Sequence, residues 1–287
     1  MPVEIISKQR RLPTRGEVLV EVGQQVQPET VVAKGVVPNH EIHDLNLFKQ
    51  LRVEPEVVKN YLTKAEGEQV ARDEVIAVSR SFFTRQTRVS RSPVDGFIER
   101  VSTVNGRVYI RGNPLDVEVT AYIPGVIKEV IPEEGAVVEA SGIRFEGAFG
   151  IGGEAYGDII LTSEGPDTPL SSDDILPEHK GKVIVGGSIA TLDALREAVN
   201  VGAKGVIVGG VDQKDLTYFL GYEIGVPVTG YEQTGLTLIM TEGFGVNPME
   251  GILFETLRGH SGRMACINGA TQIRSRSIRP EIILPSP

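Results

Sequence analysis

Four arginines and two phenylalanines lie close together in a stretch of the first half of the chain that contains no acidic residue. They are Arg80, Phe82, Phe83, Arg85, Arg88 and Arg91. A guanidinium group donates paired hydrogen bonds to a phosphate, and an aromatic ring can stack on an unpaired base. The stretch therefore predicts a partner-binding surface, with RNA as one candidate partner. Two alternatives stay open: docking on an acidic protein surface such as segment 131–180, or a plain strand with solvated arginines.

Two apolar stretches in the second half of the chain each end in a pair of glycines. The residues concerned are Gly186, Gly187 and Ser188 after the first stretch, and Gly209 and Gly210 in the second. Backbone amides at such strand ends can surround an anion. No Walker pattern and no G-x-G-x-x-G accompanies them, so a tight turn between strand and helix is the alternative to a phosphate or nucleotide site.

The C-terminal segment 251–287 has a small excess of positive charge, five basic against two acidic residues. Arg263 and Arg274 are its candidate contact residues. The sequence H-S-G-R-M-A-C-I at 260–267 resembles a KOW-type motif, in which a glycine-centred turn contacts RNA or a ribosomal partner. The segment reads as short strands, beginning at 251–258, that form a small SH3-like β barrel. A β cap with surface arginines is the alternative.

Residue types that carry out catalysis are sparse and are not arranged for it. His40 and His43 could share a metal ion, but no third ligand can be named, so no metal and no cofactor is expected. Cys266 lies in an apolar stretch, where an inert buried thiol is the usual state. The G-x-S-x-G pattern of serine hydrolases does not occur. The sequence thus favours a protein that is not an enzyme.

Composition limits the remaining classes. The 287 residues carry 29 Lys and Arg against 38 Asp and Glu, a formal net charge of −9, which excludes a uniformly basic nucleic-acid coat protein. The acidity is concentrated in residues 131–180. No apolar run approaches the ~20 residues that span a bilayer, and the first residues lack a signal-peptide pattern. A cytoplasmic protein without a membrane partner is expected.

The elements that would position these residues are predicted from four similar stretches in residues 14–142. They begin near Gly16, Leu62, Pro93 and Pro124, and each has an alternating apolar strand, a glycine turn and a second short strand. One such stretch cannot bury its apolar face alone, so the four must pack on one another.

Three motifs in these stretches, V-G-Q-Q-V, A-E-G-E-Q-V-A-R-D-E-V-I-A and S-P-V-D-G-F-I, resemble the barrel-sandwich hybrid of biotinyl and lipoyl domains. The resemblance implies a hairpin whose tip carries the modified lysine eight residues before the proline. That position holds Arg85, and 79–92 contains no lysine, so a swinging-arm carrier is not expected. In large assemblies this fold serves as a docking module, which is the role that the resemblance suggests here.

The predicted fold class is mixed β and α/β. The expected domains are a barrel-sandwich hybrid at 1–145 with a helical insert near 44–62, a strand and acidic linker at 146–176, a small parallel α/β domain at 177–245, and the SH3-like segment at 246–287. Helices are expected at 191–199, with Thr191 as N-cap, and at 212–222.

The leading functional hypothesis is a non-enzymatic adaptor or scaffold that binds a macromolecular partner, a protein or an RNA- or transcription-associated complex. One alternative is a module that binds a small ligand, or acts as an enzyme, at the glycine pairs. The other is a homo-oligomeric structural protein, because exposed edge strands invite pairing.

Overall fold

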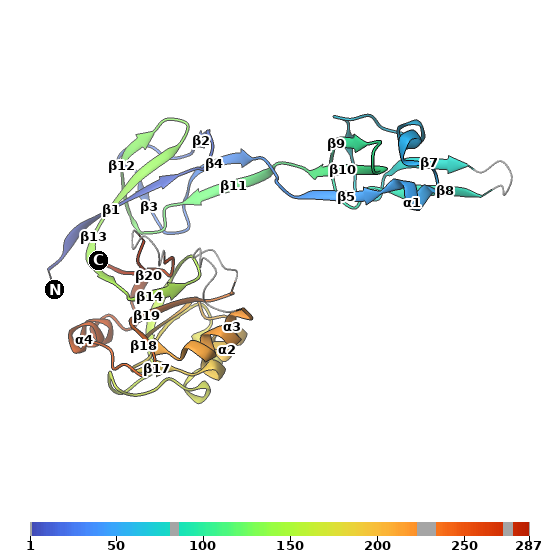
Figure 1. Ribbon diagram of the computed structural model, residues 1–287. Coiled ribbons are helices and arrows are strands. Elements are labelled where there is room, and N and C mark those ends of the chain that lie inside the picture. The colour runs from blue at the N-terminus through green and yellow to red at the C-terminus, as the bar shows by residue number, and fades with distance from the viewer. Residues whose placement is uncertain (1, 81–85, 223–233, 272–277, 287) are drawn as a thin grey trace. The chain divides into compact units, whose positions relative to one another are not determined.

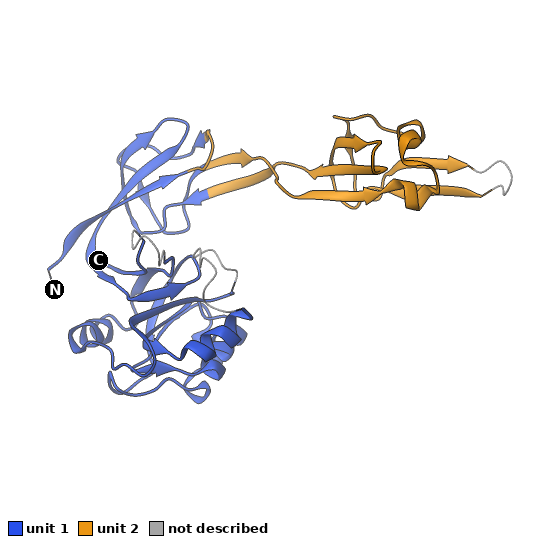
Figure 2. Cartoon of the chain, viewed as in Figure 1, with its two compact units in different colours: residues 1–11, 17–33, 119–287 blue, residues 12–16, 34–118 orange. Residues whose placement is uncertain are grey.

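The computed structural model describes residues 2–80, 86–222, 234–271 and 278–286. The fold is mostly β, with several sheets, one of which mixes parallel and antiparallel strands, so the expected mixed β and α/β class is confirmed at this level. The chain divides into two compact units, shown in Figure 2. Unit 1 comprises residues 1–11, 17–33 and 119–287, and unit 2 comprises residues 12–16 and 34–118.

These units differ from the expected division at residues 145, 176 and 245. Unit 2 interrupts unit 1 in the sequence, and everything after residue 118 belongs to unit 1. The reason is the way in which the four similar stretches pair. The first packs with the fourth in unit 1, and the second packs with the third in unit 2.

Unit 2 is a small β structure with two short helices in the stretch that was expected to be helical (Figure 1). Its elements are β5 (Ile42–Asn46), α1 (Leu47–Leu51), the 3-10 helix η1 (Pro55–Tyr61), β6 (Gln69–Val70), β7 (Val75–Arg80), β8 (Thr87–Arg91), β9 (Gly96–Ser102) and β10 (Arg107–Gly112). One sheet has the order β5-β10-β9-β6, and β7 pairs with β8 in a two-stranded ribbon. Leu47, Leu51, Ile76 and Ile98 are among the residues that fill its core.

The N-terminal part of unit 1 is built on antiparallel strands. They are β1 (Glu4–Arg11), β3 (Gln25–Val26), β12 (Gly125–Ile131) and β13 (Gly135–Glu146). The strands β2 (Gly16–Val18), β4 (Val31–Val37) and β11 (Leu115–Thr120) form a separate sheet in the order β11-β4-β2, and the boundary between the units falls within these strands.

The remainder of unit 1 is the α/β part. Its strands are β14 (Phe149–Ile151), β15 (Glu154–Leu161), β16 (Val183–Val185), β17 (Ile189–Ala190), β18 (Gly205–Val211), β19 (Thr237–Phe244), β20 (Met264–Asn268) and β21 (Glu281–Pro285). Its helices are α2 (Leu192–Val201), α3 (Gln213–Leu220), α4 (Gly251–Gly259), and the short 3-10 helices η2 (Ser172–Asp174) and η3 (Pro177–His179). The parallel strands β15, β16, β18 and β19 confirm the predicted parallel sheet.

Helices cover both faces of this sheet, as the alternation of buried strand residues requires. Ile184 and Val206 pack in one core with α2 and α3, whereas their neighbours Val185 and Ile207 pack in another with α4. In Figure 1, α2 and α3 lie together and α4 lies apart from them. The side chain of Thr191 accepts a hydrogen bond from the Ala194 amide at 3.1 Å, so the predicted N-cap is confirmed.

The C-terminal segment differs from the prediction. Residues 251–259 form α4 rather than a strand, because Leu253, Phe254 and Leu257 fall on one helical face and are buried. The strands β20 and β21 extend the long sheet by pairing with β15 and β13, so within the described residues they do not form a barrel of their own.

The two units contain the same local structure. We call residues 17–33 and 121–139 the outer repeat, and residues 61–77 and 92–111 the inner repeat. The Gly23 amide donates to the Ile127 carbonyl at 2.8 Å, and in the inner repeat Gly67 donates to Ile98 at 2.7 Å. The Ile127 amide in turn donates to the Gln24 carbonyl, and in the inner repeat the Ile98 amide donates to the Glu68 carbonyl.

The correspondence extends to irregular features of the strands. The register of β12 on β13 shifts at Lys128, and that of β9 on β10 shifts at Glu99, the equivalent residue. A Cβ added to Gly125 would lie 2.2 Å from the Glu139 carbonyl oxygen on the neighbouring strand. A Cβ added to Gly96 would lie 2.1 Å from the Arg111 carbonyl oxygen on the neighbouring strand of the inner repeat. The inner repeat is therefore a second copy of the outer one, inserted between β4 and β11.

Candidate partner-binding surface

The arginine-rich stretch forms the ribbon of β7 and β8 in unit 2. Ser79 pairs with Arg88 and Arg80 pairs with Thr87, so the strands remain paired up to the last of these residues. Residues 81–85, which follow β7 in the sequence, lie outside the described residues and include the predicted contacts Phe82, Phe83 and Arg85.

One face of the ribbon is fixed and the other is open to solvent. Ser90 is buried, and its hydroxyl donates to the Gln50 side chain of α1 at 2.6 Å. Val89 points the opposite way and is 45% exposed. Arg80 lies two residues beyond Val78, the partner of Val89, and therefore shares this open face.

The arginines of the ribbon carry charge that no carboxylate neutralises among the described residues. Arg80 is exposed and makes no described contact, Arg88 donates to the Gln86 side chain at 3.0 Å, and Arg91 donates to the Asp73 carbonyl at 2.6 Å. Elsewhere in unit 2 several cations have carboxylate partners. Ion pairs join Arg107 to Asp44, Arg111 to Glu99, Lys59 to Glu66 and Lys64 to Glu74.

Net charge separates the two units as well. Unit 2 carries 14 Lys and Arg against 12 Asp and Glu, a formal charge of +2, and unit 1 carries 15 against 26, a charge of −11. A polyanion would thus be repelled by unit 1 and attracted to unit 2. Arg263, the other described candidate, belongs to unit 1, is exposed and donates to the Gly259 carbonyl at 2.7 Å. Arg274 lies outside the described residues.

The glycine pairs are buried at the ends of β16 and β18. The amides of Gly186, Ser188 and Gly209 donate to backbone carbonyl oxygens at 2.8–3.1 Å, which leaves them no free proton for an anion. A Cβ on Gly187 would lie 2.3 Å from the Thr168 oxygen.

The second pair is equally crowded by backbone. A Cβ on Gly209 would lie 1.9 Å from the Asn247 oxygen, and one on Gly210 would lie 2.2 Å from that of Gly245. These glycines allow loops to cross closely over the strand ends. The same residue pattern suits an anion loop, which is why the sequence left both functions open.

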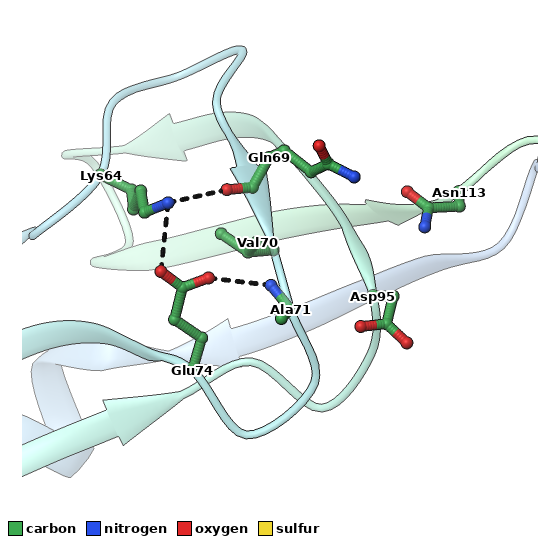
Figure 3. Close-up of a pocket in the computed structure, with 7 residues that line it drawn as sticks. All are labelled: Lys64, Gln69, Val70, Ala71, Glu74, Asp95 and Asn113. Atoms are coloured by element: carbon green, nitrogen blue, oxygen red, sulfur yellow. Dashed lines mark hydrogen bonds and ion pairs between the residues drawn. The ribbon is translucent and has the colours of Figure 1, made fainter.

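A pocket of about 330 Å³ in the inner repeat was not predicted (Figure 3). The ammonium of Lys64 donates to the Gln69 carbonyl at 3.1 Å and pairs with Glu74 at 3.1 Å. Asp95 and Asn113 line the other side, and the buried Oδ1 of Asn113 has no donor among the described atoms. These residues come from distant segments and form no local motif.

Among the other chemically active groups, Cys266 is fully buried. Burial, together with the carboxylates of Glu154 and Glu281, raises the pKa of its thiol to about 12. Within the described ranges no cluster of three or more His, Cys, Asp or Glu side chains could hold a metal ion. His43 instead contacts Glu41 at 3.2 Å.

None of the helices among the described residues is long and apolar enough to cross a membrane. Comparison with protein-family models, with curated proteins and with solved structures gives no match for this chain.

Proposed function

We propose that this chain is a non-enzymatic adaptor, in which both repeats are versions of the barrel-sandwich hybrid that lack the acceptor lysine, and the β7–β8 ribbon binds RNA. The observation that carries the proposal is the contrast within unit 2. Arg80 and Arg91 are exposed and Arg88 is half-buried, and none of the three forms an ion pair among the described residues, whereas Arg107 and Arg111 of β10 are both ion-paired. Unneutralised guanidinium groups on a supported ribbon are suited to phosphate.

The sequence of residues 81–85 and the charge of the units support RNA over an acidic protein. Phe82 and Phe83 lie two and three residues after Arg80 in the sequence, and aromatic side chains give single-stranded nucleic acid a stacking surface that a protein partner does not need. The charge of −11 on unit 1 would confine the contact to unit 2.

The test is the salt dependence of binding to a fluorescent single-stranded RNA, measured by anisotropy. The double variant Arg80→Gln/Arg88→Gln is expected to bind at least tenfold more weakly. Its slope of log affinity against log salt should fall by about 1.4, because each lost phosphate contact removes ~0.7. Arg107→Gln/Arg111→Gln is the matched control, since it removes the same charge from the same unit at ion-paired positions.

Equal losses in both double variants would overturn the ribbon as the site. Binding of polyglutamate but not of RNA would overturn RNA as the partner and point to an acidic protein. A pull-down from cell extract with and without nuclease separates these outcomes independently.

A further inference from the structure

The outer repeat provides an internal reference for the pocket in the inner repeat. The two share their hydrogen bonds with a constant offset of 44 residues in the first half, so Lys64 corresponds to Val20 and Glu74 to Thr30. Val20 is buried in the core of unit 1, whereas Lys64 lines the pocket. The inner repeat thus has a charged side chain where its own counterpart has an apolar one.

The carboxylate of Glu74 is not needed to form the local turn. It accepts the Ala71 amide at 2.9 Å, and the hydroxyl of Thr30 accepts the Gln27 amide at the same distance in the outer repeat. A neutral side chain therefore closes this turn equally well, and the charge of Glu74 pairs with Lys64 in addition.

Two acceptor groups of the pocket, the side chains of Asp95 and Asn113, have hydrogen-bonding capacity left. The ammonium of Lys64 has two partners, the Gln69 carbonyl and Glu74, as the dashed lines in Figure 3 mark. Asp95 accepts only the Arg72 amide, at 2.8 Å through Oδ1, in the described structure. The Oδ1 of Asn113 is buried and accepts nothing there.

The free acceptors and the charge of the lining indicate which kind of ligand the pocket would bind. An unpaired buried acceptor lowers stability, and a ligand that donates a hydrogen bond to it would remove that cost. The three charged lining residues, Lys64, Glu74 and Asp95, sum to −1, so a cationic ligand is favoured over an anionic one. The volume of about 330 Å³ is at the lower end of the range for small-molecule sites.

We infer that this pocket binds a primary alkylammonium group, held by Asp95 and Asn113. The group can belong to a free amine or to a lysine side chain of a partner, and both present the same three donors. This inference is independent of the proposed RNA contact, because the pocket residues and the ribbon arginines are different.

The experiment is an NMR titration of the ¹⁵N-labelled full chain with 1,4-diaminobutane and, separately, with N-acetyl-lysine amide. Saturable shifts at the amides of residues 69–71 and 95 are expected, and sodium butyrate should give none. Saturation by the diamine alone identifies a free amine, and saturation by the lysine derivative identifies a lysine side chain. Saturation by neither, or by butyrate as well, would overturn the inference.

Variants test the assignment of residues. Asp95→Asn keeps an oxygen for the Arg72 amide and should weaken binding at least tenfold. Glu74→Thr installs the residue of the outer repeat, keeps the turn closed, and should also weaken binding, because Lys64 loses its partner and repels the ligand.

Glu68→Gln is the matched control. It removes one negative charge from the same repeat at a position where the outer repeat already has Gln24, with the same backbone contact. Binding should change less than twofold. A loss as large as that of Asp95→Asn would mean only a general attraction of cations, and the inference would fail.

Discussion

Two buried ionisable residues in unit 1, Cys266 and Tyr122, are held in their neutral forms. Burial raises the pKa of Tyr122 well above its ordinary value, and the charges of Glu281 and Glu154 add to the effect. Its hydroxyl has no described partner, and its backbone has a φ of +69°, which is rare for an aromatic residue. Lys8 and Arg10 flank its ring at 6.0 and 5.4 Å.

These pKa values predict how stability changes at alkaline pH. A thiol with a pKa of about 12 in the folded chain and 9.0 in the unfolded chain binds its proton more tightly when folded. Its contribution to the free energy of unfolding is therefore complete below pH 9 and is lost progressively as the pH rises towards 12. Urea unfolding from pH 8 to 11 should give a flatter profile for Cys266→Ala than for the unmodified chain.

Thiol labelling provides a second measurement for the same prediction. Iodoacetamide at pH 8 should modify Cys266 only in urea, because the reactive thiolate forms only after unfolding. Rapid labelling of the folded chain, or parallel pH profiles for the two proteins, would contradict a buried neutral thiol.

At the scale of elements, the equivalence of the two repeats has a steric consequence. Gly96→Ala and Gly125→Ala would each place a Cβ about 2 Å from a carbonyl oxygen of the neighbouring strand. Each should lower the free energy of unfolding by about 3 kcal/mol, as overpacked core positions do. Chemical denaturation measures the effect.

Gly251→Ala is the control for this pair. Its Cβ would meet nothing within 4 Å at the start of α4, so the change should be neutral or stabilise by up to ~1 kcal/mol. If only one of the two repeats proved sensitive, the structural equivalence of Gly96 and Gly125 would be refuted.

Local patterns in the sequence predicted those elements whose signals are local. The predicted cap at Thr191 marks the start of α2, the apolar spacing after Asp212 marks α3, and the Val and Ile runs mark the parallel strands. The run Ile252-Leu253-Phe254 reads equally well as a strand, and tertiary packing decides in favour of α4. The partner of each repeat stretch could not be predicted, because all four have the same apolar alternation and register is set by distant contacts.

Candidate sites, like secondary-structure elements, could be predicted only where their residues are adjacent in the sequence. Continuous stretches such as Arg80–Arg91 can be found in a sequence because their residues are adjacent. The pocket escapes notice because Lys64, Asp95 and Asn113 come together only through the pairing of the inner repeat.

At the scale of the molecule, the insertion of unit 2 predicts that it can be removed. The strands β4 and β11 are sheet neighbours, as β7 and β8 are in the inner repeat. Replacing residues 37–115 by Asn-Gly should give an ordinary hairpin and leave unit 1 folded. Dispersed NMR spectra and a cooperative thermal transition would support this.

The shortened protein also tests whether RNA binding belongs to unit 2 alone. It should lose RNA binding, because the ribbon is gone and the remaining unit is strongly acidic. An aggregated or unfolded product would contradict the autonomy of unit 1, whereas a folded product that still binds RNA would move the contact away from unit 2.

The placement of one repeat inside the other also determines the order in which the chain can fold during synthesis. Residues 17–33 leave the ribosome long before their partners at 121–139, and Val26 and Val32 lack their core until then. The inner repeat lies in one continuous segment and can fold first. Once the inner repeat has folded, the two parts of the outer repeat are joined by a shorter effective loop than an unfolded connection of the same length. Closing that loop costs less conformational entropy, so folding of unit 2 lowers the entropic barrier to folding of unit 1.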